Sequence, residues 1–274
     1  MSYIAFIGAG NMGGALVRGA CRAIPPEDVV IYRPTAAAAD ALAAETGCRT
    51  AKSGAEAAKG ARYVVLCVKP QILCPVLEGL LPALEESINA GLRPVVVSIA
   101  AAVRLDEIRR VLSAGGLDLP VVRVMPNTPS AIGRGVLLTA PGDGVGEEEY
   151  AGLERVFSGC GLVERVSEAE LDLGSTVAGC GPAFVYLFIE GLADGGVQIG
   201  LPRDKAQRWA AEMVAGAAEM VLRTGEHPGV LKDAVCSPGG TTIEGVAALE
   251  ARGFRSAAAQ AVAAAWKKNC DLGK

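Results

Sequence analysis

The residue pattern with the clearest chemical meaning is Gly8-Ala9-Gly10-Asn11-Met12-Gly13, which matches G-x-G-x-x-G. It follows an apolar run, Tyr3–Ile7, and precedes a predicted helix, Gly14–Ala23, which is the context of a dinucleotide-binding loop. In such a loop the first glycine permits a tight turn, the second lets a pyrophosphate approach the backbone, and the third lets the helix pack on the strand. The free N–H groups at the helix start then face the pyrophosphate. A glycine-rich turn without a ligand is the alternative.

The residues after the second predicted strand, Val29–Tyr32, indicate which dinucleotide the loop would accept. Enzymes that use NAD usually place Asp or Glu there, about 20 residues beyond the glycines, to bind the ribose 2′-OH. This chain has Arg33 and Thr35 instead. A guanidinium and a hydroxyl suit a 2′-phosphate, because both can make charge-assisted hydrogen bonds to it. We therefore expect NADP(H) to be preferred over NAD(H), with a solvated loop charge at Arg33 as the alternative.

A third pattern lies near the C-terminus, where Ser237-Pro238-Gly239-Gly240-Thr241-Thr242 precedes apolar residues at helical spacing, Ile243, Val246 and Leu249. Proline, two glycines and hydroxyl residues before an amphipathic stretch are typical of a helix start with free backbone N–H groups. Such a start binds anions, including carboxylates. The alternative is an ordinary threonine cap after a glycine turn.

The elements that position the first two patterns alternate along the chain as apolar runs and helical stretches. The predicted strands are Tyr3–Ile7, Val29–Tyr32, Tyr63–Val68, Val95–Ile99, Val121–Val124, Gly135–Thr139 and Leu162–Val166. Strands that are apolar on both faces and are separated by helices are typical of a parallel sheet covered on both sides. We predict an α/β fold with a doubly wound parallel (Rossmann) sheet, as an NADP-binding domain over residues 1–166.

Strand patterns stop near residue 166, and an all-helical domain is predicted over residues 167–274. Its predicted helices are Glu168–Ala178, Pro182–Gln198, Arg203–Thr224, Val230–Val235, Thr242–Ala251 and Ser256–Cys270. Pro182 and Pro202 fall at or just before the first turns of two of them, where helices accept proline.

Composition excludes several classes of protein. A hydrophobic fraction of 51% is too high for a disordered chain, and a net charge of −4 with 4% aromatic residues argues against nucleic-acid binding. The uncharged run over 173–189 is too broken by glycine and Pro182 to span a membrane. Eight cysteines without C-x-x-C spacing and a single histidine predict no metal site. The apolar start shows no leader pattern, so we expect a cytoplasmic protein.

Several motifs together resemble those of the pyrroline-5-carboxylate reductase family, and the resemblance covers essentially the whole chain in order. The segment around Ser237–Thr242 is far more specific to that family than the glycine loop, which many dehydrogenases share. The other resembling segments are Phe6–Gly13, Val68–Gln71, Met125–Pro129, Gly179–Phe184, Gly200–Arg203 and Gly253–Arg255. Two positions depart from the family pattern: Cys180 stands where serine is common, and Ala234 where some relatives have a cofactor-binding asparagine.

The resemblance implies NADPH-dependent reduction of 1-pyrroline-5-carboxylate to L-proline, the last step of proline biosynthesis. It implies that Asn127 faces the nicotinamide and substrate, and that Thr242 hydrogen-bonds the pyrroline nitrogen. Ser237, Gly239, Gly240 and Thr241 would bind the substrate with it. The resemblance also implies a homodimer through the helical domain, with a decamer of five dimers as a larger assembly. The implied cofactor contacts after the central strands are Val68, Lys69, Pro70, Ile99 and Ala101.

The chemistry of a cyclic imine agrees with the scarcity of acid groups. A protonated imine accepts hydride readily, so the enzyme needs orientation more than a strong acid. His227 lies in a predicted loop, and a structural role is favoured over general acid catalysis. Three alternatives stay open: another NADPH-linked imine reductase, a 3-hydroxyacid dehydrogenase-like enzyme, and a non-catalytic NADP(H)-sensing module.

Overall fold

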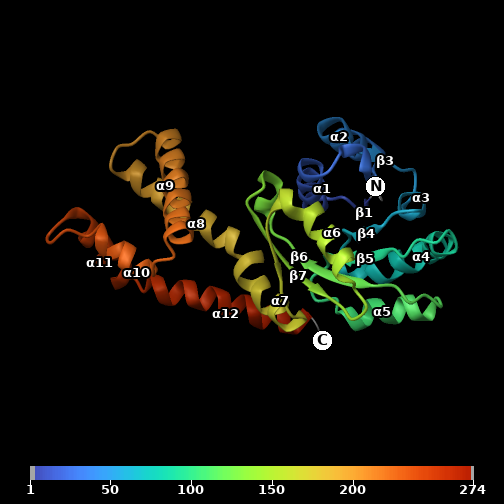
Figure 1. The fold of residues 1–274 in the computed structure, drawn as a ribbon. Helices are drawn as coiled ribbons and strands as arrows, with labels where there is room; N and C mark the ends of the chain where they lie inside the picture. The colour runs from blue at the N-terminus through green and yellow to red at the C-terminus, as the bar shows by residue number, and fades with distance from the viewer. Residues whose placement is uncertain (1–3, 273–274) are drawn as a thin grey trace. The chain divides into compact units, whose positions relative to one another are not determined.

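An eight-stranded sheet forms the core of the first part of the chain (Figure 1). The computed structural model describes residues 4–272 and places the strands in the order β3-β2-β1-β4-β5-β6-β7-β8. The strands are β1 (Ile4–Ile7), β2 (Val29–Tyr32), β3 (Arg49–Thr50), β4 (Tyr63–Leu66), β5 (Val95–Ser98), β6 (Val121–Met125), β7 (Gly135–Pro141) and β8 (Gly161–Arg165). The strand order reverses between β1 and β4, and ligands of doubly wound sheets bind at that point.

The predicted α/β fold is confirmed, with one strand that differs from the expected direction. Neighbouring strands from β3 to β6 are parallel, and β7 pairs with β8 in parallel, but β7 runs antiparallel to β6. The connection from β6 to β7 contains only a short 3₁₀ turn, η2 (Thr128–Ile132). A parallel crossover needs a dozen residues or more, so this short connection returns the chain in the opposite direction.

Helices cover both faces of the sheet. Alternate strand residues divide the core, since Phe6 and Val65 belong to one apolar cluster and Ile7 and Val64 to the other. On the first face lie α1 (Asn11–Ala23), α2 (Ala36–Thr46) and α6 (Glu147–Phe157); on the second lie α3 (Gly54–Ala58), α4 (Pro70–Asn89) and α5 (Leu105–Ala114). Short turns η1 (Pro26–Asp28) and η3 (Ser158–Cys160) complete the connections.

The predicted helix Glu168–Ala178 is divided in the structure into two parts. It comprises α7 (Glu168–Gly174) and a π turn, η4 (Ser175–Gly179). Side-chain hydroxyls of Ser175 and Thr176 donate to carbonyls three residues earlier, at 2.7 Å. Such π turns inside helical segments occur frequently at functional sites.

Five further helices follow: α8 (Gly181–Gln198), α9 (Arg203–Thr224), α10 (Pro228–Ala234), α11 (Thr241–Ala251) and α12 (Phe254–Leu272). The chain forms two compact units, one reaching Cys180 and including the chain from Trp266 onward, the other spanning Gly181–Ala265. The last strand, β8, ends at Arg165, whereas the two units divide after Cys180. The change from α/β to helical structure therefore comes earlier in the chain than the boundary between the units.

The second unit leaves large apolar side chains in contact with solvent. Leu187 is 69% exposed, and Trp209 and Met220 are about half exposed. Large exposed apolar side chains are typical of surfaces that pack against another chain when they are contiguous. One helical stretch, Glu168–Gln198, is long and apolar enough by length and composition to cross a membrane. The π turn interrupts that stretch, and Glu190 and Asp194 lie within it.

Candidate active site

The glycine loop joins β1 to α1 with the geometry that a dinucleotide requires. Gly8 has φ +83°, and a side chain there would lie 2.5 Å from Val68 Cγ1. Gly13 packs against Cys67, and an added methyl group would lie 2.8 Å from the Cys67 Cβ. Gly10 faces open space, because only the Gly8 carbonyl oxygen would lie within 4 Å of a methyl group there. The first and third glycines therefore serve the fold, and the second leaves room for a ligand.

The start of α1 is free to bind an anion. Gly10 caps the helix without a side-chain hydrogen bond, and Gly14 is the first residue whose N–H bonds back to it, at 2.7 Å. The N–H groups of the three residues between them have no intrahelical partner, as at any helix start. Backbone donors and the helix dipole together suit a pyrophosphate. The loop fits the nucleotide that its sequence predicts.

Arg33 and Thr35 lie where β2 gives way to α2, next to this loop. Arg33 is half-buried, and its Nη1 lies 3.4 Å from the Ala38 carbonyl oxygen, which is a long hydrogen bond. Thr35 caps α2, but its hydroxyl makes no capping bond and is exposed. Both side chains line the end of β2 with donors that a phosphate could engage.

The predicted contacts after the central strands lie at the same carboxyl edge of the sheet. Val68 and Lys69 follow β4, and Pro70 is the first residue of α4. Lys69 is exposed, whereas Val68 packs on the core. Ile99 and Ala101 follow β5 in a turn that the Ser98 hydroxyl stabilises by accepting from the Ala100 N–H at 3.2 Å. The first unit therefore brings the loop, β2, β4 and β5 residues together at one edge.

Asn127 follows β6 at this edge, and the residue is buried, with 6% of its surface exposed. Its Nδ2 donates to the Ala178 carbonyl oxygen at 2.9 Å, and its Oδ1 accepts from the Val136 N–H at 3.0 Å. Both ends of the amide are therefore bound to backbone. The Asn127 side chain therefore links the end of β6 to β7 and to the π turn η4 through two hydrogen bonds.

The residues Ser237–Thr242 come together in the second unit at the start of α11. Gly239 has φ +66°, which glycine adopts readily. The Gly240 N–H donates to the Ser237 carbonyl oxygen at 3.0 Å, and Gly240 caps the helix without a side-chain bond. Thr241 and Thr242 occupy the first turn and are exposed. This is a short turn into an open helix start, with hydroxyls and N–H groups free for an anionic ligand.

His227 has a structural contact. Its Nδ1 accepts from the Gly229 N–H at 3.0 Å and so caps α10. A ring nitrogen that caps a helix must be unprotonated. This contact favours the structural role expected for His227.

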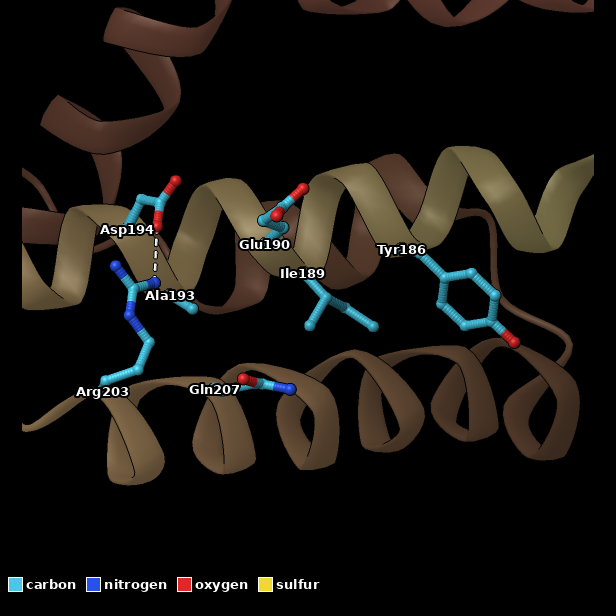
Figure 2. Close-up of a pocket in the computed structure, with 7 residues that line it drawn as sticks. All are labelled: Tyr186, Ile189, Glu190, Ala193, Asp194, Arg203 and Gln207. Atoms are coloured by element: carbon cyan, nitrogen blue, oxygen red, sulfur yellow. Dashed lines mark hydrogen bonds and ion pairs between the residues drawn. The ribbon is translucent and has the colours of Figure 1, made fainter.

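A pocket of about 530 Å³ between α8 and α9 contains none of the predicted site residues (Figure 2). Glu190 and Asp194 line it from α8, and Arg203 from the start of α9 points to Asp194 and forms an ion pair with it. The carboxylate of Glu190, which also lines the pocket, would repel an anionic substrate. The helix start of α11 is therefore the better candidate for a carboxylate in this unit.

Comparison with known proteins decides the family. Residues 168–272 match the model described as pyrroline-5-carboxylate reductase dimerisation, and residues 3–102 match that of NADP oxidoreductase, coenzyme F420-dependent. The chain is 40% identical over 273 residues to the pyrroline-5-carboxylate reductase of Escherichia coli, covering 99% of this chain and 98% of that protein. The chain belongs to the pyrroline-5-carboxylate reductase family. It is therefore related to oxidoreductases that act on a C=N bond, and its C-terminal helices form the dimerisation domain of the family.

Other members of the family are similar to this chain over nearly its full length, in sequence and in structure. The Synechocystis reductase is 41% identical, with 99% of this chain and 98% of that protein covered. The structure of the Coxiella burnetii reductase superposes with a TM-score of 0.87 at 31% identity, covering 100% of this chain and 99% of that one. The structure of the Plasmodium falciparum enzyme, solved with NADP bound, gives 0.86 at 30% identity, covering 100% and 98%. These likenesses support an NADP(H)-binding first domain.

Two features of the site were not predicted from the sequence. A pocket of about 250 Å³ beside Arg33 is also lined by Arg18 and Glu45. Ala102, after β5, is the one non-glycine residue among residues 4–272 with positive φ, at 62°. Arg18 lies on α1, but its ion-pair partner Glu45 lies on α2. Residue spacing within α1 could therefore not predict that Arg18 belongs to this pocket.

Proposed function

We propose that this protein reduces 1-pyrroline-5-carboxylate to L-proline with NADPH. The observation that carries the proposal is the open start of α11, where Gly240, Thr241 and Thr242 present free donors beside a glycine turn. Such a start binds the carboxylate of a small anionic substrate. Family membership over the full length of the chain supports the same assignment.

The residues of the first unit hold the coenzyme, and the coenzyme supplies the hydride. The loop at Gly8–Gly13 binds the pyrophosphate through the N–H groups of α1. Val68, Lys69 and Pro70 would line one side of the coenzyme, and Ile99 and Ala101 would lie by the ribose next to the nicotinamide. Asn127 keeps the end of β6 in place through its bonds to Val136 and Ala178.

The second unit binds the substrate. Ser237, Gly239, Gly240 and Thr241 surround the carboxylate with backbone donors and hydroxyls. The Thr242 hydroxyl accepts a hydrogen bond from the protonated ring nitrogen, which orients the imine carbon for hydride transfer. Orientation of a reactive iminium lowers the barrier without a strong acid.

The coenzyme preference follows from Arg33 and Thr35. A doubly charged 2′-phosphate gains hydrogen bonds from the guanidinium and hydroxyl that a 2′-OH cannot use equally. We expect Arg33→Ala to raise KM for NADPH by about tenfold and to leave KM for NADH nearly unchanged. Equal effects on the two coenzymes would remove Arg33 from the specificity site. Arg110→Ala, on α5 against the opposite face of the sheet, is the matched control.

The helical domain forms the homodimer, and a decamer of five dimers is the larger assembly. The exposed apolar side chains of α8 and α9 supply the surface that a second copy would cover. We expect the protein to work in the cytoplasm. Size-exclusion chromatography with light scattering should give a mass of two subunits or a multiple of it. A stable, active monomer would contradict the dimer.

The activity is tested by following NADPH oxidation with pyrroline-5-carboxylate as substrate. Six-membered cyclic imines and 3-hydroxyacids with NADP are assayed in parallel. Preferred turnover of pyrroline-5-carboxylate supports the proposal, and preferred turnover of another substrate would reassign the enzyme. No turnover of any imine would favour the NADP(H)-sensing alternative.

A further inference from the structure

The surface between α1 and α2 carries two guanidinium groups in one pocket. The pocket, of about 250 Å³, begins at Gly10 and Asn11 of the glycine loop and extends past Arg33 to Arg18 and Glu45. Both helices pack on the same face of the sheet (Figure 1). The pocket is therefore continuous with the nucleotide loop and the end of β2.

Arg18 reaches toward this loop from the second turn of α1. Side chains on a helix point back toward its N-terminus. The Arg18 guanidinium accordingly lies over Gly14, where a methyl group would stand 3.3 Å from its Nη1. Gly14 leaves the space that the guanidinium occupies, one turn from the start of the helix.

Glu45, at the end of α2, holds this guanidinium from the other side. Arg18 Nε and Nη2 donate to the two Glu45 carboxylate oxygens, each at 2.6 Å. The side chains are 34% and 52% exposed. Exposed ion pairs contribute little to stability, so a doubly charged phosphate can compete with Glu45 for Arg18.

We infer that Arg18 is a second cationic contact for the 2′-phosphate of the coenzyme, beside Arg33, and that Glu45 both orients Arg18 and competes with the phosphate for it. The pocket carries the charges of Arg18 and Arg33 against one carboxylate, so it has a net positive charge. A neutral 2′-OH could accept only an ordinary hydrogen bond from a second guanidinium, whereas a doubly charged phosphate gains charge-assisted bonds. The inference rests on the proposed NADP(H) preference, and it adds a specificity-determining pair to that site.

The test uses two variants that break the same ion pair and have opposite expected effects. Adenosine 2′,5′-bisphosphate and AMP, which differ by the 2′-phosphate, are titrated into the full-length protein by calorimetry. Arg18→Ala should weaken bisphosphate binding by about tenfold, because a charged donor is lost. Glu45→Gln should strengthen it by about threefold, because a competing charge is lost. Neither variant should change AMP binding, and Arg110→Ala should change neither ligand.

A purely structural role for the pair predicts that both variants weaken both ligands. That result, or bisphosphate binding unchanged in Arg18→Ala, would overturn the inference. Arg33→Ala separates this failure from failure of the proposed coenzyme preference. If the wild-type protein binds the bisphosphate no better than AMP, the preference itself is wrong and the Arg18 contact is wrong with it. If Arg33→Ala removes the preference while Arg18→Ala does not, only the Arg18 contact is wrong.

Discussion

Asn127 donates a hydrogen bond from Nδ2 to the carbonyl oxygen of Ala178, at 2.9 Å. The two residues are 51 positions apart in the sequence. The bond ties the carboxyl end of β6, where a coenzyme would lie, to the π turn that precedes the helical unit. A side chain at the centre of the predicted site is therefore engaged in holding the backbone.

Asn127→Asp tests this role. The carboxylate keeps the acceptor for the Val136 N–H but loses the donor to Ala178 and faces its carbonyl oxygen instead. Because a buried acceptor is left unpaired, the free energy of unfolding should fall by about 1–3 kcal/mol. Urea denaturation measures the change, with the exposed substitution Asn89→Asp as the control. Equal midpoints for the two variants would show that the bond is not stabilising.

Substitution of the buried Arg123 should lower the free energy of unfolding more than Asn127→Asp does. It donates from Nη1 to Glu168 and from Nη2 to Asp172, both at 2.8 Å, and so anchors α7 to β6. The Arg123 side chain is 2% exposed. Removing the buried guanidinium leaves Glu168 and Asp172 with only the exposed Arg104 as a nearby cation, at 3.3 and 3.9 Å, so Arg123→Met should destabilise the protein by about 2–3 kcal/mol. Arg110→Ala, which breaks an exposed pair with Asp106, should cost less than about 1 kcal/mol in the same measurement.

Gly8 and Gly10 should respond differently to the same methyl group. In Gly8→Ala, alanine would have to adopt a left-handed conformation, and its methyl group would clash with Val68. The melting temperature of this variant should therefore fall. Gly10→Ala meets open space and has φ −71°, so the fold should persist while NADPH affinity falls. Thermal melting and NADPH fluorescence titration separate the two outcomes. A Gly10→Ala protein that binds NADPH normally would place the pyrophosphate elsewhere.

The Thr242 hydroxyl is the predicted contact for the ring nitrogen. Thr242→Ala should lower kcat/KM while the fold is unchanged. The loss corresponds to about 1–3 kcal/mol of transition-state stabilisation. Thr242→Ser keeps the hydroxyl and should recover most of the activity. Steady-state kinetics with pyrroline-5-carboxylate, and circular dichroism for the fold, make the comparison. Unchanged kinetics in the alanine variant would remove Thr242 from the catalytic residues.

Cys160 gives a prediction about pH. Burial of Cys160, the last residue of η3, in the apolar cluster that includes α1 raises the pKa of its thiol to about 12. The unfolded chain has a cysteine pKa of about 8.5, so it loses this proton more readily than the folded protein, and stability should fall as pH rises above about 8.5. At pH 8 iodoacetamide should leave Cys160 unmodified in the folded protein and modify it in guanidinium, as peptide mass mapping would show. Rapid labelling of the folded protein would contradict the burial.

The local patterns of the sequence were sufficient for most elements. Helix α9 has the predicted bounds, and the glycine loop adopts the turn that its three glycines require. The two-residue strand β3 and the short helix α3 were not predicted, because segments so short carry no periodicity. The division of the predicted helix at Gly174 was also missed, since nothing in Ser175–Gly179 distinguishes a π turn from an α-helix by spacing.

Local residue patterns were enough to predict the sheet, the nucleotide loop, the donors Arg33 and Thr35 after β2, and the open start of α11. Each depends on residues close together in the chain, whose conformation follows from glycine freedom, apolar alternation or capping. Four features became visible only in the folded chain: Asn127 binds Ala178, Arg123 anchors α7, β7 runs antiparallel to β6, and Glu45 pairs with Arg18. Those contacts join residues on separate elements, and they exist only after the apolar faces of the helices have packed on the sheet.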